Sequence, residues 1–164
     1  VLITVFANIS GAHFNPFVSL AMFLRKKITG KLLIIYIPAQ ILGCLLGVML
    51  ANVFFEHNIL ELSTKNRDGF HIFLSEIIAT FGLIFIIFAT LKDGKITIAA
   101  SVATYIMAGY WFTSSTSFAN PAVAIARTFT DSFTGINYMN TPTYILAEFL
   151  GALIAVFLIK KLIK

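Results

Sequence analysis

The sequence has little charge and almost no cysteine. Charged residues make up 12% of its 164 residues, where ordinary soluble domains have about 25%. The single cysteine, Cys44, excludes an intrachain disulfide, and we interpret it as a small residue of the interior. The low charge excludes a disordered chain, a nucleic-acid-binding domain and most soluble enzymes.

The apolar residues fall in long blocks. They make up 59% of the sequence, and the mean hydropathy is +0.92. A bilayer core of about 30 Å is crossed by roughly 20 residues of helix. Four blocks come near this length: residues 32–55, 70–91, 96–112 and 143–159. We therefore predict an all-α membrane protein that lies in a lipid bilayer and has no nucleic-acid partner.

The net charge of +5 is concentrated in a few places. Nine of the twelve Lys and Arg residues occupy three patches, at residues 25–31, 92–95 and 160–164. The stretches 56–69 and 130–141 carry few or none. Since cytoplasmic loops carry an excess of Lys and Arg, we expect the three patches and the C-terminus on the cytoplasmic side.

Two further apolar segments are too short to span a bilayer. One follows Asn15-Pro16 and runs to Leu24, and the other follows Asn120-Pro121 and runs to Phe129. Asn is a favoured N-cap, and Pro fits the first helical position because its missing N–H needs no partner there. About nine helical residues at 1.5 Å each cover half a bilayer. We predict two re-entrant half-helices.

These segments indicate an internal duplication. Aligning Asn15 with Asn120 also pairs Pro16 with Pro121 and Val18 with Val123, and residues 36–43 match residues 144–151. Counting crossings predicts inverted copies, whose half-helices meet near the membrane midplane. We divide the chain into an incomplete first repeat (1–55), an outer loop (56–69) and a second repeat (70–164). Because residue 1 pairs with residue 106, we expect an N-terminally truncated sequence.

The paired motifs Asn15-Pro16-Phe17 and Asn120-Pro121-Ala122 resemble the Asn-Pro-Ala loops of the aquaporin and glycerol-facilitator (major intrinsic protein) family. Phe17 departs from the usual alanine, and it either narrows the pore or packs away from it. The resemblance implies a homotetrameric channel for water and small neutral solutes. It implies no catalytic residue, metal or cofactor.

The half-helices give this function a physical basis. Each carries about +0.5 of an elementary charge at its N-terminus, and two such ends at the pore centre repel protons and cations. The Asn15 and Asn120 amides can donate hydrogen bonds to a passing oxygen.

By the same resemblance, the selectivity constriction is formed by Ala108, Ser117 and Val123, with a fourth position in the missing N-terminal segment. Val123 stands where the family usually has arginine, so the expected opening is wider and less polar than a strict water filter. Glycerol-like polyols, urea-like molecules and arsenous acid are then candidate solutes. The sequence looks closest to bacterial aquaglyceroporins associated with arsenic resistance, which implies a bacterial inner membrane.

Several polar residues receive supporting roles. The resemblance gives Glu76 the task of holding loop amides beside the pore. Glu148 matches Gln40 of the other copy, and we favour a polar packing role for both over a proton relay. His13 is expected to fix its loop by hydrogen bonding, and Arg127 is expected to be structural or interfacial.

Two alternatives to a conducting channel stay open. Inverted repeats with broken helices also occur in secondary transporters, although no cation stands at helical spacing from either buried acid. The chain as written is alternatively a non-conducting channel fragment, because one wall of the pore is absent from it.

Overall fold

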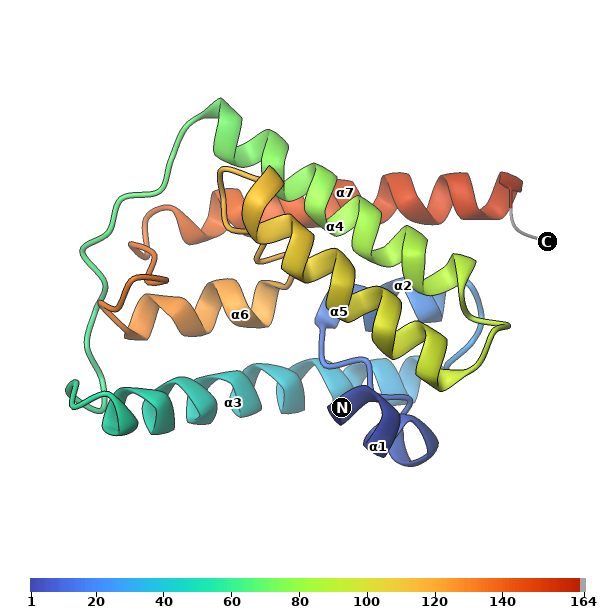
Figure 1. Cartoon of the computed structure of the whole chain (residues 1–164), viewed down its shortest axis with the longest axis horizontal. Helices are drawn as coiled ribbons and strands as arrows, with labels where there is room; N and C mark the ends of the chain where they lie inside the picture. The colour runs from blue at the N-terminus through green and yellow to red at the C-terminus, as the bar shows by residue number, and fades with distance from the viewer. Residues whose placement is uncertain (163–164) are drawn as a thin grey trace.

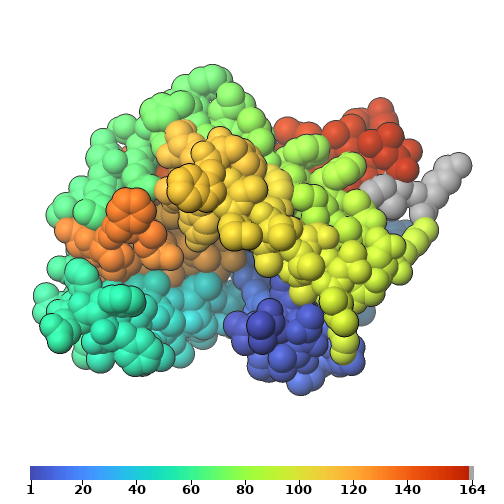
Figure 2. Space-filling model, in the orientation of Figure 1, coloured from blue at the N-terminus to red at the C-terminus, as the bar shows by residue number. Residues whose placement is uncertain are grey.

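The computed structural model describes residues 1–162, which form seven α-helices and one 3-10 helix (Figure 1). Lys164, the last residue of the third basic patch, lies outside the described residues. In the space-filling view, α5 crosses the front of the molecule, with α1 and α3 along its lower edge (Figure 2). The elements are α1 (Leu2–Ser10), α2 (Pro16–Leu24), α3 (Gly30–Phe54), α4 (Phe70–Ala89), α5 (Lys95–Phe112), α6 (Pro121–Ala126), η1 (Arg127–Phe129) and α7 (Thr141–Leu162).

Three of the four predicted spans, α3, α4 and α7, are long and apolar enough to cross a membrane. The fourth, α5, has 18 residues and carries Lys95, Thr97, Ser101 and Thr104, which lower its apolar content. The prediction of an all-α membrane fold is confirmed.

The two half-helices begin where the sequence predicts. Asn15 and Asn120 are the N-caps of α2 and α6, and their side-chain oxygens accept the backbone N–H of Phe17 and Ala122, respectively. The second half-helix tightens into the 3-10 helix η1 after Ala126. The half-helices start near the middle of the molecule and run toward opposite ends (Figure 1), as inverted copies require.

The connections that carry the basic patches lie at one end of the molecule, and the remaining long connections lie at the opposite end. The α2–α3 turn, the α4–α5 turn and the end of α7 lie together at one end of the molecule (Figure 1). These are the places of the three basic patches. The connections 55–69 and 130–140 lie at the other end. The charge pattern in the sequence thus corresponds to one face of the fold.

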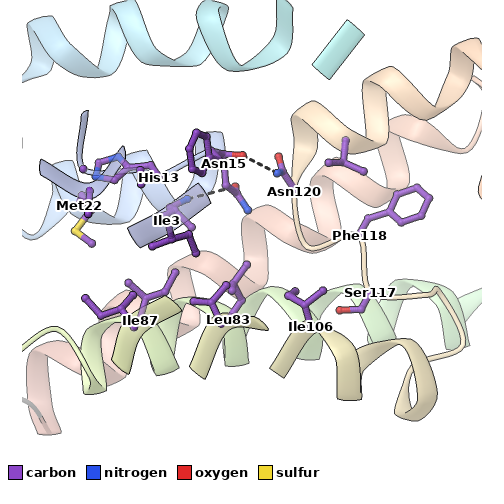
Figure 3. Close-up of a pocket in the computed structure, with 18 of the residues that line it drawn as sticks. Ile3, His13, Asn15, Met22, Leu83, Ile87, Ile106, Ser117, Phe118 and Asn120 are labelled. Atoms are coloured by element: carbon purple, nitrogen blue, oxygen red, sulfur yellow. Dashed lines mark hydrogen bonds between the residues drawn. The ribbon is translucent and has the colours of Figure 1, made fainter. Parts of the chain in front are cut away.

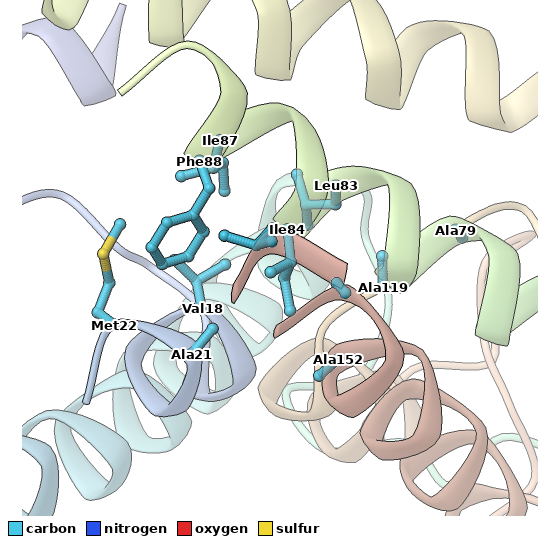
Figure 4. Packing of buried hydrophobic residues seen from close by; sticks show 12 residues of the cluster. Val18, Ala21, Met22, Ala79, Leu83, Ile84, Ile87, Phe88, Ala119 and Ala152 are labelled. Carbon is cyan, nitrogen blue, oxygen red and sulfur yellow. The ribbon is translucent and has the colours of Figure 1, made fainter. Parts of the chain in front are cut away.

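The core lies between α2, α4 and α7. Val18, Ala21 and Met22 of α2 pack against Leu83, Ile84 and Phe88 of α4 and Ala152 and Ala155 of α7 (Figure 4). Small residues bring the backbones of α4 and α7 together. A Cβ placed on Gly151 would overlap the carbonyl oxygen of Ile77 and lie 3.0 Å from the backbone nitrogen of Phe81. Such close backbone approach is typical of packed membrane helices.

Gly151 provides a test of this packing. Gly151→Ala is expected to lower the free energy of unfolding by roughly 1–3 kcal/mol, because the added methyl group meets rigid backbone. The matched variant is Gly43→Ala on α3, at the equivalent position of the first repeat, where nothing lies within 4 Å. That change is expected to be neutral or slightly stabilising, since alanine is the better helix former. Thermal unfolding in detergent measures both, and equal losses would contradict the prediction.

The connections at the end opposite the basic patches are tied to each other. Ser63 N–H donates to the Thr128 carbonyl (2.9 Å), and Asn137 N–H donates to the Lys65 carbonyl (2.8 Å). Asp131 accepts the backbone N–H of Thr64 at 2.9 Å and its hydroxyl at 3.2 Å. The loop between the repeats is therefore ordered by contacts with the second repeat.

The Thr64 backbone N–H, which favours the charged carboxylate, lowers the pKa of Asp131 below its usual range. A lowered folded-state pKa contributes stability that is present above the unfolded value of about 3.9 and is lost as the pH falls through the folded value. Asp131→Asn is therefore expected to lower the melting temperature at pH 7. This difference should shrink as the pH falls through the folded-state pKa of Asp131. A difference that persists undiminished in acid would show that charge is not its cause.

Candidate functional site

The two loops that precede the half-helices share an unusual backbone. Gly11, Ala12 and Phe14 have φ of 76°, 50° and 50°. Their counterparts at the offset that pairs Asn15 with Asn120 are Thr116, Ser117 and Ala119, with φ of 66°, 52° and 47°. Left-handed backbone is uncommon outside glycine and is least favourable for a β-branched residue such as Thr116. The same strained path in both copies supports the duplication independently of sequence matches.

The two asparagines join these loops. Asn15 Nδ2 donates to the Ala119 carbonyl at 2.6 Å, and Asn120 Nδ2 donates to the Phe14 carbonyl at 2.9 Å. Each asparagine thus caps its own half-helix through its oxygen and holds the opposite loop through its nitrogen. Each Nδ2 has a second hydrogen, which these bonds leave for another acceptor.

A cavity of about 340 Å³ runs beside this junction. Asn15 and Asn120 point toward each other on one wall, and Leu83, Ile87 and Ile106 of α4 and α5 form the opposite wall (Figure 3). No aspartate or glutamate is among the residues that line it, and the described charged residues of the lining are Lys95 and Arg127. The cavity therefore has one polar wall, one apolar wall and two cationic side chains.

The structure places two of the three predicted constriction residues on this cavity. Ser117 and Val123 line it, and Ala108 is exposed and is not among its lining residues. Gly109 is the residue of α5 that packs against Ser117, where a Cβ would lie 2.6 Å from the Ser117 hydroxyl oxygen. The α5 residues that line the cavity include Ile106 and Tyr110. Ala108 lies between these two in the sequence and on another side of the helix, because each residue turns the direction by about 100°.

Phe17 packs away from the cavity. Its ring lies 5.8 Å from that of Phe149 on α7, measured between centroids, and it lines a separate hollow with Ile125 and Thr128. The structure therefore supports the interpretation that Phe17 packs away from the cavity, and not that it narrows it.

Two buried carboxyl groups hold the second loop. Glu76 of α4 accepts the backbone N–H of Phe118 at 2.9 Å and of Ala119 at 2.8 Å. Glu148 of α7 accepts the backbone N–H of Asn120 at 2.9 Å. Both side chains are fully buried, so these bonds satisfy three consecutive backbone donors that water does not reach.

Neutral groups hold the first loop. His13 Nδ1 lies 3.0 Å from the Ser19 hydroxyl oxygen, and Gln40 Nε2 donates to the same oxygen at 2.9 Å. The Tyr36 hydroxyl donates to the Ser10 carbonyl at 2.9 Å. Glu148 and Gln40 occupy equivalent helix positions, yet one contacts a loop backbone and the other contacts a side chain.

Several residues that line the cavity were not predicted as site residues from the sequence. Val102, Ile106 and Tyr110 line the cavity at a spacing of four on α5, and this helical period in the sequence would have indicated them. Arg127, expected to be structural or interfacial, lies on the lining, and so does Lys95. Among the described residues, no three His, Cys, Asp or Glu side chains gather as a metal site requires.

The arrangement of apolar helices and two inverted re-entrant loops beside a cavity is that of a helical membrane channel or transporter. Comparison with known proteins identifies the family. Residues 1–158 match the Major intrinsic protein family, and the chain belongs to it. Aquaglyceroporin AqpS of Rhizobium meliloti (strain 1021) is 43% identical over the whole chain, which spans 70% of that relative.

More distant relatives are also similar. Aquaporin-4 of Notomys alexis is 29% identical over 94% of the chain, and the probable aquaporin TIP3-2 of Arabidopsis thaliana is 28% identical over 95%. The matched regions span 49% and 60% of these relatives. The predicted family is confirmed.

The cross-loop bonds can be tested with Asn15→Asp. Aspartate keeps the oxygen that caps α2 and loses the donor to Ala119, so two acceptors face each other where the bond was. We expect a loss of about 2–4 kcal/mol in the free energy of unfolding. Asn137→Asp is the control, because its side-chain oxygen accepts Met139 N–H and aspartate retains that role. Similar melting temperatures for the two variants would contradict a joining role for Asn15.

Proposed function

We propose that this chain forms a membrane channel for passive, bidirectional passage of water and small neutral solutes, with glycerol-like polyols among them. The observation that carries the proposal is the two-sided cavity at the junction of the loops. Asn15 and Asn120 offer N–H donors on one wall, and the opposite wall is apolar. A hydroxyl-bearing solute can replace part of its hydration on the polar wall and meets no strong binding group elsewhere. Such weak binding favours fast passage.

Exclusion of protons and cations is supported by the charges of the lining. Lys95 and Arg127 are cationic, and no described carboxylate faces the cavity. The helix α2 also begins at the junction, so its partial positive charge adds to the same potential. A cation would lose hydration there and gain no counter-charge, which makes its passage costly.

The solute class is supported by the size of the side chains at Ser117 and Val123, which line the cavity. Neither is large, and Arg127 lies one helical turn beyond Val123. This leaves room for solutes larger than water. A relative named an aquaglyceroporin fits this inference. Arsenous acid, a neutral trihydroxide of similar size to glycerol, belongs to the same proposed class.

We also propose a bacterial inner membrane location with the C-terminus in the cytoplasm. The three basic patches lie at one end of the fold, and the bias of Lys and Arg toward the cytoplasm gives the orientation. Helix α3 is largely exposed, and its exposed side chains include Ile34, Leu42 and Leu46. This helix provides an apolar surface for lipid or for another copy of the chain. A homotetramer is the assembly we propose.

The alternative is an inverted-repeat secondary transporter. The lining has no described carboxylate to couple a proton or sodium ion, and Glu76 and Glu148 are not among its residues. Passive conduction is therefore the better supported mechanism.

Stopped-flow light scattering of proteoliposomes tests the proposal. We expect water and glycerol fluxes that rise linearly with the gradient and need no ion gradient. Val123→Arg fills the cavity wall with a large cation and should reduce glycerol flux by at least about tenfold, and water flux less, since discrimination depends on pocket size. The control Ala103→Val alters an exposed position of α5 that does not line the cavity and should change neither flux. Saturable uptake driven by an ion gradient would instead establish the transporter.

A further inference from the structure

Glu76 and Glu148 form a carboxyl pair in the interior of the helix bundle. Glu76 Oε2 and Glu148 Oε1 accept the backbone N–H groups of consecutive residues, Ala119 and Asn120, so the two carboxyl groups lie side by side. Both side chains have no exposed surface. The ion pair found among residues 1–162 is His57–Glu61, in the outer loop, so neither carboxyl group of the pair has a cationic partner there. Two buried negative charges side by side would be strongly unfavourable.

One of the four carboxyl oxygens of the pair has no hydrogen-bond donor. Both oxygens of Glu76 accept backbone N–H groups, from Phe118 and Ala119. Oε1 of Glu148 accepts Asn120 N–H. Oε2 of Glu148 is buried and receives no donor. Buried polar atoms without a partner are rare, and two carboxylates offer only acceptors. A hydrogen bond between the two carboxyl groups therefore requires a proton on one of them.

We propose that the pair holds one proton, that Glu148 Oε2 bears it and that this O–H donates to Glu76, which makes Glu148 a positioning residue for the pore asparagine Asn120. Glu76 is the acceptor because its two oxygens already serve two backbone donors. With the proton on Oε2, the other oxygen of Glu148 keeps carbonyl character and accepts Asn120 N–H. The pair then fixes three consecutive amides of the second loop with one buried negative charge.

This assignment distinguishes the two acids by what can replace them. The substitution Glu148→Gln would present an amide N–H₂ toward Glu76 and a carbonyl toward Asn120, which reproduces the pattern of donor and acceptor. The first repeat carries this residue type at the equivalent position, in Gln40. The substitution Glu76→Gln would instead leave one acceptor oxygen for two backbone donors. The inference does not depend on the proposed function except where flux is measured.

Infrared spectroscopy of the purified protein at neutral pH tests where the proton is. A protonated carboxyl group has a C=O band apart from those of carboxylates and amides. We expect one such band in the parent, its loss in Glu148→Gln, and its retention in the control Asp93→Asn, which alters an exposed acid. Absence of the band from the parent, or its survival in Glu148→Gln, would overturn the assignment.

Thermal unfolding gives a second, independent measurement. Glu148→Gln should melt within about 2 °C of the parent, and Glu76→Gln and Glu148→Leu should melt roughly 4–10 °C lower, because each leaves a buried amide unpaired. Equal losses for Glu148→Gln and Glu148→Leu would overturn the proposal.

Solute flux links the pair to Asn120. Glu148→Gln should keep flux within about twofold, and Glu148→Leu should reduce it even when compared per folded protein, since a displaced donor weakens a positioned site. If the parent carries no flux, the channel proposal fails. The infrared and unfolding results still decide whether Glu76 and Glu148 share a proton.

Discussion

The structure depends on satisfying non-helical backbone in the middle of an apolar molecule. Two loops reach the interior, and their amide and carbonyl groups have neither a helix nor water to pair with. Asn15 and Asn120 meet this requirement by capping their own half-helices and donating to the carbonyls of Ala119 and Phe14. Without these bonds the loops would carry unpaired polar groups at a cost of several kcal/mol each. The same amides then become the polar wall of the cavity.

The two loops are held by different chemistry. The first is fixed by neutral groups, in which His13 and Gln40 meet at the Ser19 hydroxyl. The second is fixed by the carboxyl groups of Glu76 and Glu148, which accept three successive amides. The carboxylate of Glu76 accepts more strongly than a neutral oxygen, so charge contributes to the anchoring of the second loop. The duplication preserved the backbone path and allowed the anchors to diverge.

Local features of the sequence could predict much of this. The Asn-Pro pairs define the starts of α2 and α6 because capping is a short-range property. The apolar blocks define the long helices because the bilayer sets their length. The absence of Ala108 from the cavity lining and the outward packing of Phe17 could not be predicted this way. Both depend on the rotation of one helix against another, which arises from the packing of distant residues.

The position of charge around the cavity is consistent with the proposed passage of neutral solutes and exclusion of ions. Its acids lie behind the loop, where they bind amides and do not reach the lining, and its cations lie on the lining. If these acids faced the cavity as carboxylates, they would attract cations. Placing them one layer back lets them orient the donors of Asn120 while the cavity keeps a positive potential. The anchoring of the loop and the proposed selectivity of the cavity therefore follow from the same arrangement.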